Sequence, residues 1–207
     1  MTSGLWVLIV ASAVLVFWVV GAYNRLVRLK NAIGAAFAQL DEHLRRRHEL
    51  IARLMEVVGV PLKHESGALD ALLAAGTQAR DAAERARVTP LLAGPLGALA
   101  GAEQMLAASL QRVLALVEHH AELQHDGAVR ELADALTETR HRIGFARLAY
   151  NDQVQAFNDA SAQFPTVVLA RVFGFFPLEP LVALHEQPPF FAHGPEPGRT
   201  AATCGPM

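Results

Sequence analysis

The chain of 207 residues contains one cysteine, few charged residues and no excess of basic charge. The single cysteine, Cys204, excludes a disulfide framework and a zinc site made of several cysteines. Charged residues make up 18% of the chain, and the formal net charge is −2 with a pI near 6.5. Nucleic-acid-binding domains normally have a basic face and a high pI, so we expect no nucleic-acid partner. The apolar share of 52% also excludes a mostly disordered chain.

Proline is absent from residues 1–60 and from residues 96–164. Because a proline inside a helix costs about 3 kcal/mol or more, both stretches are free to form long helices. The prolines lie at position 61, between residues 89 and 95, and from residue 165 onward.

Residues 5–22 form an apolar run, LWVLIVASAVLVFWVVGA, with one serine as its only clearly polar side chain. As a helix this run would be about 27 Å long, close to the thickness of a hydrocarbon core. Trp6, Trp18 and Tyr23 lie near its ends, where aromatic rings favour the membrane interface. No charged segment precedes the run and no good cleavage motif follows it, so we expect a retained transmembrane helix rather than a cleaved signal peptide.

The flanking charges predict the orientation of this helix. Arg25, Arg28 and Lys30 follow the run before the first acidic residue, Asp41, whereas residues 1–4 carry only the α-amino group. By the positive-inside rule, the N-terminus lies outside and the rest of the chain lies in the cytoplasm.

Apolar residues recur every seven positions in both proline-free stretches, a spacing that keeps one side of a helix facing a partner helix. The first stretch contains two such rows: Leu26, Ile33, Leu40 and Leu54, and Phe37, Leu44, Ile51 and Val58. The second stretch contains the rows Leu99, Leu106 and Val113, and Val129, Leu136, Ile143, Tyr150, Phe157 and Phe164. The pattern indicates amphipathic helices, and no strand-like alternation has comparable length.

We therefore expect an all-α protein, in which the transmembrane helix continues into an elongated antiparallel bundle of three or four helices. The expected bundle helices are residues 23–58, 70–87, 98–124 and 128–160. Residues 94–101 lack the Lys-Ser/Thr ending of a phosphate-binding loop and are interpreted as a connector. The apolar residues 164–176 are too short for a second span and would cap the bundle or lie along the membrane surface. The chain is expected to have four parts: an outer N-terminus (residues 1–4), a transmembrane helix (5–22), the bundle (23–176) and a Pro/Gly-rich disordered tail (177–207).

Two stretches of the sequence resemble the LemA family of bacterial membrane proteins. Residues 23–58, YNRLVRLKNAIGAAFAQLDEHLRRRHELIARLMEVV, are similar to its signature helix. Residues 138–158, ETRHRIGFARLAYNDQVQAFN, with Phe164-Pro165 and Phe173-Gly174-Phe175 after them, are similar to its last helix and closing motif. His48 stands where family members commonly have a tyrosine. The resemblance implies a single-pass protein of the bacterial cytoplasmic (inner) membrane with a helical cytoplasmic bundle, and no established enzymatic activity.

His119, His120 and His125 cluster near the end of an expected helix, beside two glutamates. A zinc or iron site needs three or four ligands that converge from fixed positions, and no His-Glu-x-x-His motif occurs. Histidines near a helix C-terminus commonly complement the helix dipole instead. We therefore expect no metal and no other cofactor, and no arrangement of residues indicates a catalytic site.

Three consecutive arginines, residues 45–47, interrupt the apolar rows of the first stretch. Arg45 and Arg46 would lie on a solvated face or form a patch that binds a partner. Arg47 falls on an apolar row, where a charge must find a partner or reach solvent. We hypothesise that Arg47 pairs with Glu138 or Glu103 of a neighbouring helix and so fixes the helix register.

Tyr150, Asn151 and Asp152 are the other polar interruption of an apolar row. Tyr150 lies on the row itself, which favours core packing with its hydroxyl group at the bundle edge over catalysis. Asn151 and Asp152 are candidates for structural or partner contacts.

Three functions are compatible with these features. The first is a non-enzymatic scaffold or docking protein in the bilayer, which would bind an unidentified protein or a second copy of itself. The second is a signal-transmitting membrane protein whose continuous helix passes on a shift. The third, a membrane-tethered metal-dependent hydrolase, has no supporting set of residues.

Overall fold

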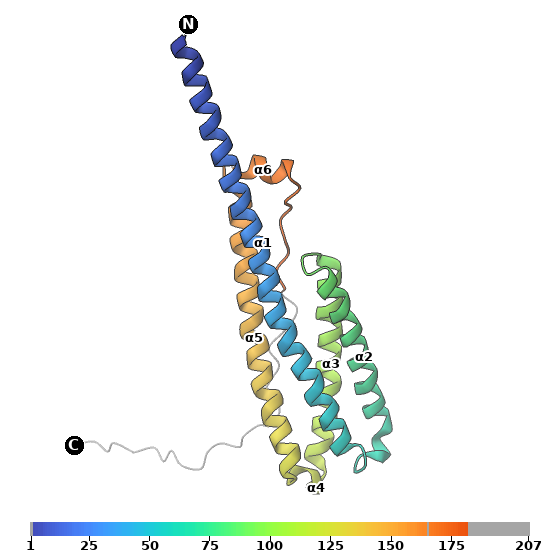
Figure 1. Cartoon of the computed structure of the whole chain (residues 1–207). Helices are drawn as coiled ribbons and strands as arrows, with labels where there is room; N and C mark the ends of the chain where they lie inside the picture. Colours follow the sequence, from blue (N-terminus) through green and yellow to red (C-terminus); the bar gives the residue numbers. More distant parts are fainter. Residues whose placement is uncertain (1, 165, 182–207) are drawn as a thin grey trace, which may run out of the picture.

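The computed structural model describes residues 2–164 and 166–181, and these residues form helices and connections without a β-strand (Figure 1). The expected all-α fold is therefore confirmed. The helices are α1 (Thr2–Val58), a short 3₁₀ helix η1 (Lys63–Glu65), α2 (Ser66–Val88), α3 (Ala93–His119), α4 (Ala121–Gln124), α5 (Gly127–Ala162) and α6 (Thr166–Val172).

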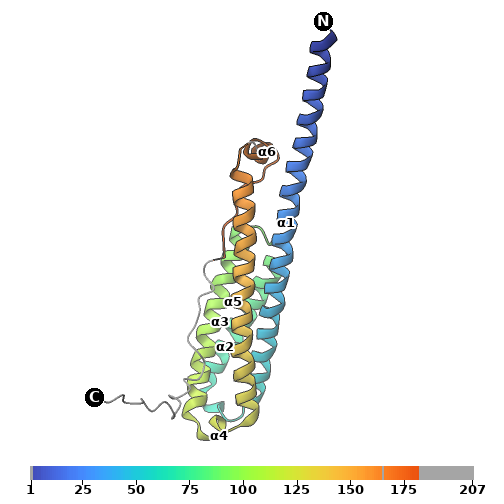
Figure 2. The same cartoon turned by 90° about the vertical axis from the view of Figure 1, so that its left-hand side faces the viewer.

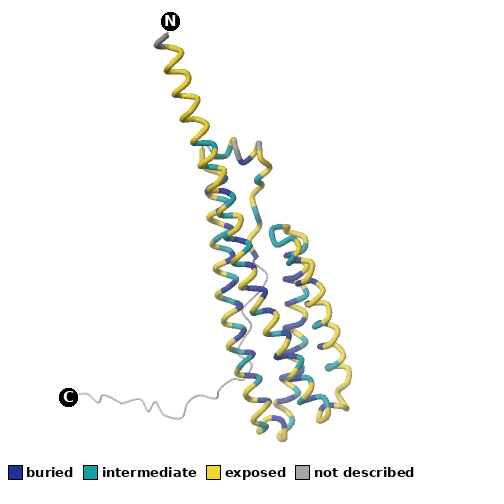
Figure 3. Tube along the Cα trace, viewed as in Figure 1, coloured by how far each residue is buried: buried dark blue, intermediate teal, exposed yellow. Residues whose placement is uncertain are grey.

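Helix α1 is a single unbroken helix of 57 residues, about 85 Å long at helical rise. Its N-terminal part is exposed and extends beyond the other helices, and Leu26 is its first described buried residue (Figures 2 and 3). The exposed part includes an 18-residue window with a mean hydropathy of 2.6, which is long and apolar enough to cross a membrane.

The four long helices alternate in direction and form an antiparallel bundle (Figures 1 and 2). Helix α1 packs closely along α5, and α2 packs closely along α3, so two helix pairs face each other across the bundle. The short α4 lies at the end farthest from the N-terminus, and α6 lies at the opposite end of the bundle (Figure 1).

The predicted apolar rows form the core. All eight row residues of α1 are buried, as are the rows of α3 and the α5 row from Val129 to Phe157. Phe164 is an exception because α5 ends at Ala162, and its side chain is 85% exposed. The seven-residue spacing therefore extends one step beyond the helix that uses it.

Helix α2 begins at Ser66, before the expected residue 70, and both expected boundaries of α3 differ from the observed ones. Residues 94–101 are not a connector, because α3 begins at Ala93 and includes them. Pro95 lies in the first turn of α3, where backbone N–H groups lack helical acceptors in any case, so its missing N–H costs little. Helix α3 also ends at His119 rather than at residue 124, since His120 has an extended backbone and α4 begins after it.

Residues after α6 run back along α5. The side-chain amide of Asn158 accepts a hydrogen bond from the Leu178 N–H at 2.9 Å and donates one to the Leu178 carbonyl at 2.8 Å. Asn151, seven residues earlier, makes the same pair of hydrogen bonds with Leu181, at 2.8 and 3.4 Å. The expected start of a disordered tail at residue 177 is therefore too early. Residues 182–207 lie outside the described part of the chain.

Candidate functional site

A layer of polar side chains divides the apolar core into two clusters. One cluster lies toward the N-terminal end of the bundle and the other toward α4. The first cluster ends at Leu44 on α1, Leu99 on α3 and Ile143 on α5. The second cluster begins at Leu50, Leu106 and Leu136 on the same three helices. Between them lie Arg47, His48, Glu103 and Thr139, which together are called the polar layer below.

Glu103 on α3 is the centre of the polar layer, and its side chain is 0% exposed. One carboxylate oxygen, Oε2, contacts Nη2 of Arg47. The other, Oε1, lies 2.8 Å from Nε2 of His48. Two consecutive residues of α1 thus contact the two oxygens of one carboxylate, which places α1 and α3 at a defined height relative to each other.

Burial lowers the pKa values of both α1 residues. It lowers the pKa of Arg47 to about 10, so the guanidinium stays cationic at neutral pH. Burial lowers the pKa of His48 to about 4, with smaller contributions from the nearby cations Arg47 and Arg80. His48 is therefore neutral at pH 7 and donates its Nε2–H to the Glu103 carboxylate, which can only accept.

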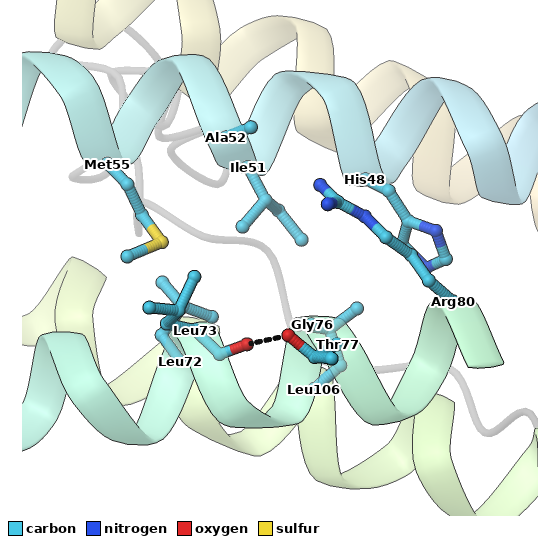
Figure 4. A pocket seen from close by; sticks show the side chains of 10 residues that line it. All are labelled: His48, Ile51, Ala52, Met55, Leu72, Leu73, Gly76, Thr77, Arg80 and Leu106. Atoms are coloured by element: carbon cyan, nitrogen blue, oxygen red, sulfur yellow. Dashed lines mark hydrogen bonds between the residues drawn. The ribbon is translucent and has the colours of Figure 1, made fainter. Parts of the chain in front are cut away.

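A cavity of about 190 Å³ opens beside the polar layer, between α1 and α2 (Figure 4). His48 and Arg80 lie side by side at one end, and Met55 lies at the other (Figure 4). Most of the remaining lining is apolar. The Thr77 hydroxyl group donates to the Leu73 carbonyl of its own helix at 3.0 Å, so it is not directed to a ligand.

A second, polar cleft of about 370 Å³ lies on the other side of His48, between the same two helices. Charged residues of both signs line this polar cleft: Arg45, Glu49, Arg80, Glu84 and Arg87. At its edge, Nε of Arg87 donates to the buried Asp41 carboxylate at 2.7 Å, a hydrogen bond that raises the pKa of Arg87. Asp41 and Arg87 thus join α1 to α2.

Arg45 and Arg46 lie at the surface and Arg47 lies in the core, as the apolar row predicts. Arg45 and Arg46 are half-exposed and pair with acids of their own helix, Arg45 with Asp41 at 3.7 Å and Arg46 with Glu49 at 3.4 Å. Of the two acids named for Arg47, the structure brings Glu103 to it. Glu138 instead binds Arg142 of its own helix at 2.5 Å on an exposed face.

Tyr150 is fully buried, and its hydroxyl group donates to the Pro90 carbonyl at 3.2 Å, in the α2–α3 connection. Its ring packs edge-on against Phe37 of α1. Asn151 makes the contacts with Leu181 described above, whereas Asp152 is exposed.

Two of the three clustered histidines form hydrogen bonds with backbone carbonyl groups. Nδ1–H of His120 donates to the Leu116 carbonyl at 2.8 Å, and that of His125 donates to the Ala121 carbonyl at 2.9 Å. Over residues 2–164 and 166–181, no three His, Cys, Asp or Glu side chains are arranged to hold a metal ion.

The residues predicted for the membrane interface lie within the apolar run of α1 and just after it. Trp6 is exposed within the apolar run, and Trp18 is partly covered. Tyr23 contacts the rings of Phe173 and Phe175, with centroids 5.3 and 6.1 Å away. Arg25 and Arg28 are exposed on the following turns.

Sequence reasoning did not single out His48, Arg87 or Asn158 as contact residues. His48 lies four positions after Leu44, so helical periodicity puts it at the edge of the apolar row. Asn158 lies seven positions after Asn151, a repeat that follows the same period. Arg87 gave no such signal, because its partner Asp41 lies on another helix.

Comparison with known proteins gives one family relationship. The sequence model of the LemA family matches residues 36–189, which include most of the bundle and the whole polar layer. No curated protein matches the chain significantly.

Proposed function

Because the chain belongs to the LemA family, we propose that it is a non-enzymatic, membrane-anchored docking protein whose helical bundle binds a protein partner beside the bilayer. LemA is not a known enzyme family. Family membership and the exposed apolar part of α1 together support membrane anchoring.

The continuity of α1 carries this proposal. One helix includes both the apolar run and the core residues from Leu26 to Val58, with no loop between them. Helix α5 packs along the bundle part of α1 and stiffens it. A bundle attached in this way keeps a fixed height and direction relative to the bilayer, which a docking surface needs and a flexible tether would not provide.

The polar cleft between α1 and α2 is the surface that we propose for the partner. Its rim carries the half-exposed Arg45 beside the acids Glu49 and Glu84. Exposed ion pairs contribute only about 0–1 kcal/mol, so a partner with charges of both signs can replace them at small cost. The neighbouring Arg46 extends the same face.

The orientation and the membrane are also part of the proposal. Arg25 and Arg28 follow the apolar run directly and are exposed, which favours a cytoplasmic bundle and an outer N-terminus. The family resemblance supports the cytoplasmic membrane of a bacterium.

Crosslinking of intact membranes followed by mass spectrometry tests the docking function. We expect a discrete set of crosslinked proteins with the native chain, and loss of these crosslinks in the double variant R45E/R46E. The matched control is Arg53→Glu, which reverses an exposed arginine of the same helix outside the polar cleft and should keep the crosslinks. Equal partner sets for native chain and double variant would contradict a role for this face.

The same experiment separates docking from signal transmission. Glu103 joins α1 to α3, and Arg87 joins α1 to α2, so an axial shift of α1 would move both other helices. Crosslinks between two copies that change with growth conditions, without other partners, would favour the signalling function.

A further inference from the structure

Outside the apolar run of α1, exposed apolar side chains are most concentrated in one short stretch near the N-terminal end of the bundle. Phe164, Val168, Phe173 and Phe176 are 85, 55, 53 and 74% exposed. Single exposed apolar residues are ordinary, but several within thirteen consecutive residues indicate a surface that binds something.

Ring contacts place this stretch at the end of the apolar run. Tyr23, the first residue after the run, packs against Phe173 and Phe175, and Phe175 also packs against Phe157 of α5 at 6.1 Å. Gly174 has a φ of +71°, a conformation that side chains disfavour, and allows the chain to reverse between these two phenylalanines. The Phe175 N–H then donates to the Ala170 carbonyl at 2.8 Å, which fixes the turn on α6.

Helix α6 lies across the direction of α1 in both views, where α1 leaves the bundle (Figures 1 and 2). If α1 crosses the bilayer, the axis of α6 therefore lies along the membrane plane. Ala170 is buried against the bundle core, whereas Val168 and Arg171 on the same helix are exposed. Helices with apolar and basic side chains in this orientation bind the boundary between headgroups and acyl chains.

We propose that residues 164–176, called the interface platform here, insert Phe164, Val168 and Phe176 into the headgroup region of the bilayer that α1 crosses. The proposal rests on the membrane anchoring proposed above. The bilayer is the expected occupant because the platform is continuous with the span through Tyr23, so lipid headgroups reach it without any further binding event. The platform and the span then form two contacts with one membrane and limit the tilt of the bundle.

Single-cysteine labelling of the full chain in phosphatidylcholine–phosphatidylglycerol vesicles tests the proposal. Cys204→Ser removes the only cysteine, and V168C and F176C then carry an environment-sensitive fluorophore on the platform. Two control labels complete the set. V14C labels the span, and F145C labels a 72% exposed side chain about 25 Å along α5 from its C-terminal end at Ala162. We expect lipids brominated high on the acyl chain to quench the fluorophores at residues 168 and 176, and not the fluorophore at residue 145. Lipids brominated near the chain ends should quench the platform labels less.

Each other outcome overturns the proposal in a distinct way. Platform labels that resemble residue 145, with residue 14 quenched, would show an anchored chain without an interface platform. A label at residue 14 that neither brominated lipid quenches would overturn the anchoring and the platform together. Blue-shifted platform labels that brominated lipids do not quench would show that protein, such as a second copy of the chain, covers this face.

Discussion

At the scale of residues, Arg47 and Glu103 are two buried charges, and each has the other as its neighbour in place of water. Removing a charge from water costs several kcal/mol, and a close opposite charge offsets this only when both partners are present. Glu103 also accepts the His48 N–H, so each of its oxygens contacts a group on α1. The contact therefore contributes little net stability but strongly penalises any register that separates the partners.

Replacement of Arg47 by leucine leaves the buried Glu103 carboxylate without its cation. We expect a loss of about 3–5 kcal/mol in the free energy of unfolding. The double variant R47L/E103L, which leaves no unpaired charge, should recover most of that loss. Thermal unfolding of the detergent-solubilised protein measures both effects, with Arg46→Leu on the exposed face as the control. An unchanged or higher melting temperature for R47L would contradict a register role.

His48 predicts a pH dependence of stability. Its pKa is lowered to about 4 in the folded chain from 6.5 when unfolded, so the unfolded state binds the proton more readily. The stability contributed by neutral His48 is present above pH 6.5 and is lost as the pH falls toward 4. Asp41, which raises this pKa, and Arg47, Arg80 and Arg87, which lower it, act on the same ring.

Melting temperatures at pH 7.5 and pH 5 test this dependence. We expect the native chain to lose more stability between the two values than His48→Gln, whose amide can still donate to Glu103 but does not titrate. His119→Gln, at an exposed position, should behave as the native chain does. Equal losses for the native chain and H48Q would show that His48 is not the group responsible.

At the scale of elements, the two asparagines of α5 hold an extended segment that has no helix of its own. Seven helical residues rise about 10.5 Å and three extended residues about 10 Å, so Asn151 and Asn158 meet Leu181 and Leu178 in register. Each amide forms two hydrogen bonds with one residue of the segment, worth about 1–3 kcal/mol together.

Asn158→Ala should therefore release the segment without unfolding the bundle. We expect amide hydrogen exchange at Leu178 to become about tenfold faster or more, as the loss of two hydrogen bonds implies. Gln155→Ala is the matched control, because Gln155 is exposed and bonds only Asp159 of its own helix in the described structure. Unchanged exchange at Leu178 in N158A would show that other contacts hold the segment.

Elements also show where local sequence signals are ambiguous. Residues 94–101 contain three glycines and a proline, a composition typical of loops. They form helix because Leu96 and Leu99 are buried against the other helices, and this packing outweighs a weak local preference. The break at His120 could not be predicted either, since Leu123 beyond it is apolar and buried and continues the amphipathic pattern.

At the scale of the whole molecule, the length of α1 links the apolar run to the bundle. The same helix that supplies the apolar run buries Leu26, Ile33 and Leu40 in the core. Cleavage after the run would remove the anchor but leave the apolar rows of the bundle intact. A mature protein with a retained transmembrane helix and one with a cleaved signal peptide therefore differ by a defined mass.

Intact-mass spectrometry of the protein extracted from membranes tests this anchor. We expect a chain that retains residues 1–22 and stays with the membrane fraction in high salt, because an apolar span is not held by charge. A soluble species that begins after residue 22 would contradict the anchor, and the interface platform with it. Replacement of Val10 and Val14 by arginine should release the chain from the membrane, whereas Val60→Arg, at an exposed site outside the span, should not.

The sequence by itself determined the apolar run, the helical class, the ends of the long helices near Val58 and Ala162, and the oddity of Arg47 in an apolar row. These features follow from periodicity and composition, which act between near neighbours in the chain. Only the tertiary structure decided that Glu103 rather than Glu138 meets Arg47, that Asp41 meets Arg87, and that Tyr23 meets Phe173. Such contacts depend on which helices become neighbours and at what height. That choice is made by the packing of whole faces, which no short stretch of sequence specifies.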